Sequence, residues 1–254
     1  MKKNFPPIVF EDENYLVINK PAGLIVHGAP GITEETLADL LIAKYPEIIK
    51  VGDDPIRPGI VHRLDKEVSG LMVVAKTQEA FTSLKKQFQK RDINKQYLAL
   101  AHGKVLQDFG EINFPIKRSK DGHRMAAMPA SSLKLIERKN PKNRDEGTIA
   151  GLAKSREAIT TFKVLKRFVN YTYLEVKIKT GRTHQIRVHL FAYGHPLAGD
   201  DLYTTKKTKV KNSKLNLGRV FLMANHLSFT ALDGEKKDFV LPLEPDLEKH
   251  LPRA

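Results

Sequence analysis

The sequence contains no cysteine. This absence excludes disulfide bonds, thiolate zinc sites, iron–sulfur clusters and cysteine nucleophiles. The chain also lacks any apolar stretch close to the roughly 20 residues that cross a membrane, since its richest short run covers only residues 71–75. Glu11, Asp12 and Glu13 interrupt the N-terminal region before it could form the core of a signal peptide. We therefore expect a cytoplasmic protein with no membrane partner.

Three motifs of nucleotide and acyl chemistry are missing as well. The chain has no G-x-x-x-x-G-K-[ST] loop, no G-x-G-x-x-G turn and no G-x-S-x-G elbow, on which nucleotide hydrolysis, dinucleotide redox chemistry and α/β-hydrolase acyl transfer depend. The spacing of His184 and His189 places them about 140° apart on a helix and on opposite faces of a strand, which disfavours a shared metal. We expect no metal and no nucleotide or other cofactor.

Positive charge is what the sequence has in excess. Its 43 lysines and arginines outnumber 29 aspartates and glutamates, for a formal net charge of +14. This charge exceeds what solubility needs and favours a polyanionic partner, with nucleic acid as the first candidate. Residues 117–146 and 203–219 concentrate the charge, and we predict a mobile basic loop at each. Ordinary solvated surface is the alternative for both segments.

The apolar pattern predicts an α+β fold. Strands are expected where β-branched or alternating apolar residues recur, at 15–20, 71–76, 94–101, 157–168, 171–179 and 220–230. Thr33 and Thr77, each followed by acidic or amide residues, indicate helix starts. Many strands in succession with few helices argue for a mixed, largely antiparallel sheet with flanking helices. Because no repeat or low-complexity linker divides the chain, we predict a single domain over residues 1–254.

The segment 57–76 has an unusual charge pattern. A charged cluster that includes His62, Arg63, Asp65 and Glu67 interrupts two apolar strands. Charges at the junction of buried strands are costly unless they have a role. A surface turn is the alternative interpretation.

A second segment, 179–200, is also unusual. A Thr-Gly turn leads into a predicted helix start that bears Arg182, His184, Gln185 and Arg187. Helix N-termini normally favour acids rather than arginines. This weakens the alternative that the segment is an ordinary capped helix.

Four motifs together resemble the RluA family of pseudouridine synthases. They are KPAGLIVHG (20–28), HRLDKEVSGLMVVAKT (62–77), KQYLAL (95–100) and TGRTHQIRVHLFAYGHPLAGDDLY (180–203). The resemblance runs from about residue 8 to about residue 232, and the N-terminal S4 domain of many relatives is not expected. It implies the pseudouridine synthase catalytic fold and isomerisation of selected uridines in ribosomal or transfer RNA, without a cofactor.

The resemblance implies that Asp65, the aspartate of HRLD, is the essential catalytic residue. Pseudouridine formation breaks the bond from N1 to C1′, turns the uracil and rejoins it through C5. An ionised carboxylate can attack C1′, add to the uracil ring or remove a sugar proton, and all three routes stay open. A carboxylate in a pocket without water needs a cation to stay ionised. By resemblance that cation is Arg187, with Arg182 as the second candidate.

The resemblance also implies how the uridine is bound. A uridine within folded RNA must leave its stack to reach such a pocket. Arg63, next to His62, is placed to fill the vacated space, and Tyr97 matches the ring that stacks on the flipped base. Taken alone, Tyr97 would be a core residue. Leu222 would form part of the pocket wall, and the two basic segments would select the target RNA.

Two other functions remain as alternatives. One is an RNA-binding protein without activity, although RNA binding alone gives no reason to hold a buried carboxylate against an arginine. The other is a hydrolase that uses Asp65 and Glu67 as a glycosidase-like pair, although nothing else resembles a sugar site. Nothing in the sequence suggests an obligate oligomer, so we expect a monomer.

Overall fold

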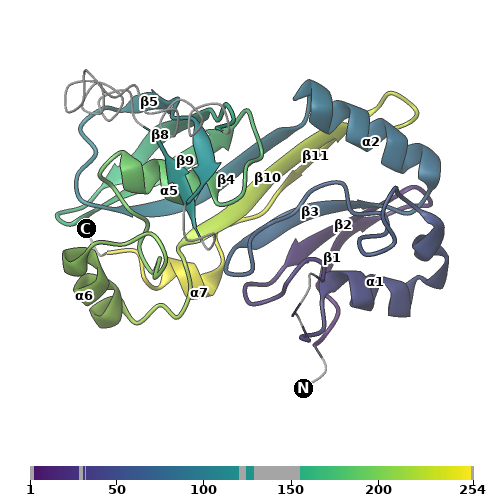
Figure 1. The fold of residues 1–254 in the computed structure, drawn as a ribbon, viewed down its shortest axis with the longest axis horizontal. Coiled ribbons are helices and arrows are strands. Elements are labelled where there is room, and N and C mark those ends of the chain that lie inside the picture. Colours follow the sequence, from purple (N-terminus) through teal and green to yellow (C-terminus); the bar gives the residue numbers. More distant parts are fainter. Residues whose placement is uncertain (1–2, 29–30, 32, 120–123, 129–154, 253–254) are drawn as a thin grey trace, which may run out of the picture. The chain divides into compact units, whose positions relative to one another are not determined.

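The computed structural model describes residues 3–28, 31, 33–119, 124–128 and 155–252. The chain forms two compact units (Figure 1). Unit 1 comprises Met1–Leu98 and Leu222–Glu248, and unit 2 comprises Ala99–Phe221 and Lys249–Ala254. The chain passes from one unit to the other inside strand β4 (Asn94–His102), again after Phe221 and a third time after Glu248. Neither unit is a continuous segment, and a single domain over 1–254 stays a prediction.

Unit 1 contains a mixed sheet. Its strands are β1 (Ile8–Glu11), β2 (Tyr15–Lys20), β3 (Ser69–Ala75), β10 (Leu222–Thr230) and β11 (Lys236–Val240), in this order. The pairs β1/β2, β2/β3 and β10/β11 are antiparallel, whereas β3 and β10 run parallel. Every residue of β3 is buried, as expected for an apolar run covered on both faces.

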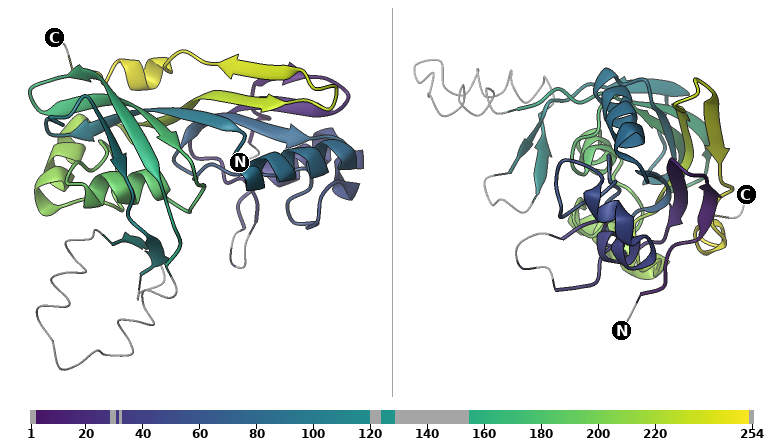
Figure 2. Two further views of the ribbon diagram at one scale, coloured as in Figure 1. Left: turned by 90° about the horizontal axis from the view of Figure 1, so that it is seen from above. Right: turned by 90° about the vertical axis from the view of Figure 1, so that its right-hand side faces the viewer.

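Helices lie on one side of these strands (Figure 2, left). They are α1 (Leu37–Lys44), a 3₁₀ helix (Pro46–Lys50) and α2 (Gln78–Lys90), and a short helix α7 (Pro245–Glu248) follows β11. Thr77 caps α2, as predicted. The predicted start at Thr33 is wrong, because α1 begins after Thr36. Thr36 and Asp39 form a reciprocal capping box that satisfies two backbone N–H groups.

Gly70 allows β3 and β10 to approach closely. Its φ is +115°, and a Cβ added there would lie 2.1 Å from the carbonyl oxygen of Ala224. We expect Gly70→Ala to lower the free energy of unfolding by at least about 2 kcal/mol, because backbone strain and overpacking add. Urea denaturation measures this. Gly234→Ala is the matched control, because its φ is +84° but nothing lies within 4 Å of the added carbon; an equal loss in both variants would contradict the packing argument.

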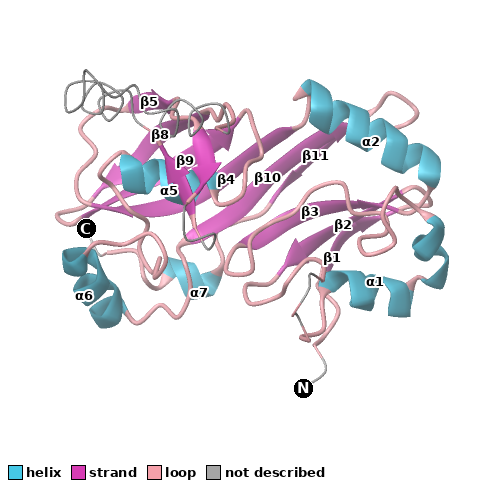
Figure 3. Ribbon diagram, in the orientation of Figure 1, coloured by secondary structure: helices cyan, strands magenta, loops and turns pink. Residues whose placement is uncertain are grey.

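In the part of unit 2 that the structure describes, antiparallel strands lie beside the helices α5 and α6 (Figure 3). The strands β9 (Tyr171–Ile178), β8 (Thr160–Arg167) and β5 (Phe109–Ile112) pair in this order, and β6 (Ile116–Arg118) pairs with β7 (Met125–Ala127). Helix α5 (Gln185–Ala192) packs against β7 and β8, and α6 (Lys206–Leu215) lies at the margin of the unit. Alternate residues of β9, including Leu174 and Val176, are buried.

The predicted mobile loop at residues 203–219 is wrong, whereas most of the predicted loop at residues 117–146 lies outside the described residues. Residues 203–219 contain helix α6, which Thr205 caps through a capping box with Thr208. Lysine is a good helix former, so a charge run is also compatible with a helix. In 117–146, the residues 117–118 and 125–127 belong to the β6–β7 hairpin, and residues 120–123 and 129–146 lie outside the described residues.

The predicted fold class is confirmed, since helices flank mixed, largely antiparallel strands. Each predicted strand is present, with ends shifted by at most a few residues. The apolar patterns predicted these strands correctly because the buried strands of both units carry the expected apolar periodicity. No helix in the described part of the chain is long and apolar enough to span a membrane.

Candidate functional site

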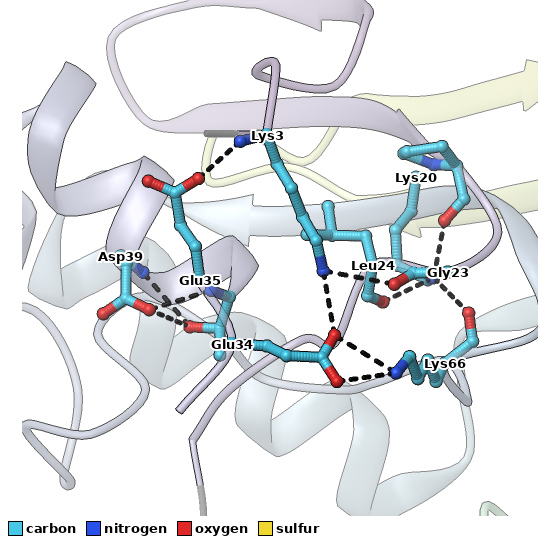
Figure 4. Close-up of polar contacts among 10 residues, drawn as sticks. Lys3, Lys20, Gly23, Leu24, Glu34, Glu35, Asp39 and Lys66 are labelled. Atoms are coloured by element: carbon cyan, nitrogen blue, oxygen red, sulfur yellow. Dashed lines mark hydrogen bonds and ion pairs between the residues drawn. The ribbon is translucent and has the colours of Figure 1, made fainter. Parts of the chain in front are cut away.

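Asp65 lies in a loop of unit 1 that leads into β3, and its side chain is half-buried. The next residue is held at its carbonyl oxygen by two donors (Figure 4). The backbone N–H of Gly23 donates to the Lys66 carbonyl at 2.7 Å, and the Lys20 ammonium donates to it at 3.3 Å. The main chain beside Asp65 is therefore fixed by residues some 45 positions earlier in the sequence.

Lys20 is fully buried at the end of β2. Its ammonium also donates to the carbonyl oxygens of Pro21 at 2.8 Å and Leu24 at 2.9 Å. A buried ammonium is costly unless acceptors surround it, and here backbone carbonyls serve. Lys20 thus ties the turn after β2 to the loop of Asp65, a role that the sequence analysis missed although Lys20 opens the first motif.

The same loop is held from its solvent side by ion pairs (Figure 4). Glu34 accepts from the Lys66 ammonium at 2.9 and 3.1 Å and from the Lys3 ammonium at 3.4 Å. The mutual effect lowers the pKa of Glu34 and raises that of Lys66, in both cases first through their hydrogen bond. These groups are exposed, so we assign the pair to positioning rather than to stability.

Arg63 is exposed and its guanidinium contacts a histidine. Its Nη1 lies 2.7 Å from Nε2 of His27, and Nδ1 of His27 lies 3.0 Å from the carbonyl oxygen of Gly28. Because arginine can only donate, Nε2 accepts and Nδ1 carries the proton that Gly28 accepts. His27, another member of the first motif that the sequence analysis did not single out, therefore orients Arg63 as a neutral imidazole.

His62 is half-buried between β3 and α2. Its Nε2 accepts a hydrogen bond from the backbone N–H of Val73 at 3.1 Å, and its ring stacks on Phe88 with centroids 4.7 Å apart. Burial, together with the charge of Lys95, lowers the pKa of His62 to about 3. The ring is therefore neutral and attaches its segment to β3. Contact of His62 with substrate stays a prediction.

Tyr97 and Leu222 are both buried in unit 1, with 5% and 3% of their surface exposed. Burial, and next the negative charge of Asp65, raise the pKa of the Tyr97 hydroxyl. Tyr97 is therefore neutral, and its hydroxyl lies close enough to Asp65 to be affected by the charge of that carboxylate. Stacking of Tyr97 on a base and the place of Leu222 in a pocket wall stay predictions.

Arg187 lies on α5 in unit 2 and is buried, with 6% of its surface exposed. It forms a bidentate ion pair with Asp200, in which Nε donates to Oδ2 at 2.7 Å and Nη2 to Oδ1 at 2.9 Å. The Asp200 side chain is fully buried. Two parallel charge-assisted hydrogen bonds fix the plane of a guanidinium group as well as its position. Asp200 thus orients Arg187.

Asp200 is itself held by the turn that follows it. Its Oδ1 accepts from the backbone N–H groups of Leu202 and Tyr203, each at 2.9 Å. The guanidinium of Arg187 lies 5.4 Å from the centre of the Tyr203 ring, a cation–π distance. The Tyr203 hydroxyl contacts Nδ1 of His184 at 2.9 Å and accepts from the Met125 N–H at 2.9 Å. Arg187 is therefore enclosed by an aromatic ring and a fixed carboxylate.

The buried Asn212 connects α6 to this cluster. Its side-chain oxygen accepts from the Gly199 N–H at 3.0 Å and lies 2.7 Å from Nε2 of His102, and its amide nitrogen donates to the Asp200 carbonyl at 3.0 Å. His102 Nε2 therefore carries the proton, because the Asn212 oxygen can only accept. Burial lowers the pKa of His102. Asn212 lies outside the motifs, so no sequence signal pointed to it.

Arg182 was predicted to lie at the start of a helix. It lies instead in the turn before α5. The helix starts at Gln185 after His184, whose φ of 53° ends the turn in the left-handed region. Arg182 Nε donates to the Glu157 carbonyl at 3.1 Å, and its backbone N–H donates to Oε1 of Gln185 at 3.0 Å. The predicted helix start is thus wrong for Arg182 and His184 and right for Arg187.

The structure places five predicted site residues in unit 1, namely His62, Arg63, Asp65, Tyr97 and Leu222, and it places Arg182 and Arg187 in unit 2. The pairing of Asp65 with Arg187 stays a prediction. Within the described ranges, no three histidine, aspartate or glutamate side chains converge as metal ligands. Asp200 and Tyr203 belong to the last motif, but their residue types alone did not mark them as candidate site residues.

Comparison with known proteins assigns the family. A family model described as RNA pseudouridylate synthase matches residues 14–192. The chain belongs to the RNA pseudouridylate synthase family. It is 42% identical over 226 residues to an uncharacterized RNA pseudouridine synthase of Aquifex aeolicus (strain VF5), covering 87% of this chain and 64% of that protein. The RluA-type resemblance of the motifs is thereby confirmed at the level of the family.

Another relative carries a more specific name. It is the ribosomal large subunit pseudouridine synthase D of Neisseria meningitidis serogroup B (strain ATCC BAA-335 / MC58), 41% identical over 246 residues, which cover 94% of this chain and 59% of that protein. The chain thus spans about three fifths of the length of these two relatives. The solved structure of human RNA pseudouridylate synthase domain containing 1 has a TM-score of 0.71 at 24% identity, covering 98% of this chain and 90% of that one. This likeness supports the fold.

Proposed function

We propose that the chain isomerises selected uridines in RNA to pseudouridine, with Asp65 as the catalytic carboxylate. The observation that carries the proposal is the family match over residues 14–192, which includes the Asp65 loop. The contacts of Lys20 and Gly23 to the neighbouring Lys66 carbonyl support it, because catalysis requires a carboxylate held in a defined position. An RNA-binding protein without activity would not need that carboxylate.

The reaction needs no other reactant. The bond from N1 to C1′ breaks, a bond from C5 to C1′ forms, C5 loses its proton and N1 gains one, so atoms and electrons balance within the uridine. Asp65 can act on C1′, on the uracil ring or on a sugar proton. We propose that Arg187, itself oriented by Asp200, keeps Asp65 ionised during this sequence, with Arg182 as the second candidate.

We also propose a base-flipping role for the residues around Asp65. Tyr97 would stack on the flipped uracil, Arg63 would fill the space left in the RNA, and His62 and Leu222 would line the pocket. The contact of Arg63 with the neutral His27 supports its assignment, because an oriented guanidinium loses less freedom on binding than an unrestrained one. The two units together would form one catalytic domain.

Large-subunit ribosomal RNA is the substrate that we propose to test first, because the relative in Neisseria meningitidis is named for it. The purified protein is incubated with an in vitro transcript that contains uridine tritiated at C5. We expect tritium to be released to water, because isomerisation removes that hydrogen. Free uracil would indicate a hydrolase, and binding without either product would indicate an RNA-binding protein. A transfer RNA transcript tests the other substrate class.

We expect activity to survive exhaustive dialysis against a chelator, because the proposed chemistry needs only protein side chains. The measurement is the rate of tritium release before and after dialysis. Loss of activity that one divalent ion restores, while the RNA stays folded throughout, would show that the reaction depends on a metal.

A further inference from the structure

Helix α6 carries five lysines and no acidic residue. At 100° per residue, four of them lie within about 140° of one another on the helix, around the exposed Val210. Val210 is 59% exposed. The four are Lys206, Lys207, Lys211 and Lys214, and Lys209 lies beside them. In the described part of the chain none of the five lysines has an ion pair, and Lys211 contacts only the side-chain oxygen of Asn170, at 3.3 Å.

The opposite face of α6 is fixed to the rest of unit 2. Asn212 is buried there and bonds to His102, to the Gly199 N–H and to the Asp200 carbonyl. Thr205 and Thr208 cap the N-terminus with uncharged groups. The lysine face is therefore held in one orientation rather than carried on a loose segment.

This charge pattern is unfavourable for an isolated helix. Lys207 and Lys211 are like charges four residues apart, a spacing at which their repulsion destabilises a helix. Lys206 and Lys207 lie in the first turn, where the helix dipole disfavours positive charge. A polyanion along the face would relieve both effects. A bound partner would therefore offset both the repulsion between the lysines and their unfavourable interaction with the helix dipole.

We propose that the lysine face of α6 is a docking surface for RNA phosphates, a proposal that rests on the proposed function because the polyanion is the RNA substrate. The occupant follows from charge complementarity, since the face offers only cations around one aliphatic residue. Phosphate contacts position an RNA without reading its sequence. The lysine face supplies affinity for RNA. The hydrogen bond from Asn212 to the Asp200 carbonyl fixes α6 to the segment whose Asp200 orients Arg187.

The test replaces Lys206, Lys207, Lys209, Lys211 and Lys214 with glutamine and measures binding of the large-subunit ribosomal RNA transcript against salt concentration. Each lost phosphate contact lowers the log–log slope by about 0.7 to 0.9. We expect a reduction by about 2 or more, the value for three lost contacts, while tritium release at saturating RNA stays within about threefold of wild type. A smaller change in slope would overturn the proposal.

The matched control removes the same number of charges elsewhere. Its five lysines each pair with a carboxylate and are Lys50, Lys85, Lys177, Lys179 and Lys237. Equal flattening by both variants would assign the effect to net charge and overturn the proposal. The five lysine-to-arginine replacements in α6 should keep the slope. If the glutamine variant does not fold, the pairs Lys206/Lys207 and Lys211/Lys214 are replaced separately, and each should lower the slope by at least about 1.

The outcomes separate this proposal from the proposed function. A wild-type protein that releases tritium but whose slope does not depend on α6 retains the function and overturns the docking surface. A wild-type protein that releases no tritium, yet binds RNA with a slope that α6 controls, overturns the function and supports the docking surface. Wild-type protein that binds no RNA overturns both.

Discussion

Replacing Asp65 with asparagine is expected to lower pseudouridine formation by at least about 10³-fold, the scale for loss of a nucleophile or base. Asparagine keeps the size and hydrogen-bonding capacity of the side chain but removes the anion that all three routes require. RNA affinity should fall little or even rise, because the variant no longer places a negative charge near the phosphates. Single-turnover tritium release and filter binding with the same RNA measure the two effects separately.

Glu67→Gln is the matched control for this prediction. It removes the same charge two residues away, from a side chain that is also half-buried, and should retain most of the activity because only Asp65 is expected to act on the uridine. A fully active Asp65→Asn variant would refute the assignment of the catalytic residue. Equal loss in both variants would indicate that the charge of the segment matters rather than the position of one carboxylate.

The second large effect is expected at Asp200. Asp200→Asn leaves the buried Arg187 without the anion that binds its Nε and Nη2. Removal of one partner from a buried ion pair costs about 3 to 5 kcal/mol. We therefore expect lower stability in urea and, at a temperature where the variant is still folded, a rate at saturating RNA at least about 100-fold below wild type. That loss in the rate is what distinguishes positioning of Arg187 from a merely structural role.

Asp201→Asn is the control for Asp200. The two residues are neighbours, but Asp201 is exposed and the change should affect neither rate nor stability. Arg187→Met should be impaired as severely as Asp200→Asn if Asp200 acts through Arg187, and the double variant should then be little worse than either single one. Independent, additive losses in the rate would contradict a shared role.

The helix starts show which structural features the local sequence can predict. Thr33 and Thr36 are each followed by acidic residues within three positions, yet only Thr36 caps α1. The backbone N–H groups of Leu37 and Ala38 donate to the carbonyls of Ile25 and Val26. These contacts join parts of the chain that are about a dozen residues apart and fix where the helix begins. Thr77 was predicted correctly because its cap bond to Ala80 is local.

Helix α6 was mistaken for a loop for a related reason. Its lysines resemble a solvated charge run, and composition alone does not show whether such a run is ordered. The capping box of Thr205 and Thr208 is local, but Asn212, which fixes α6 to the rest of unit 2, bonds to His102, a residue 110 positions earlier in the chain. A contact at that separation leaves no local pattern in a single sequence.

The sequence by itself determined the strands, the fold class and the family, because apolar periodicity and the four motifs are local properties of the chain. The tertiary structure decided which side chains hold the candidate site residues: Lys20 beside the Asp65 loop, His27 on Arg63 and Asp200 on Arg187. These partners lie 13 to 46 residues apart in the chain. For the buried Lys20, Arg187 and Asp200, folding brings the partners together because buried charges must be satisfied by whichever groups the packing places nearby.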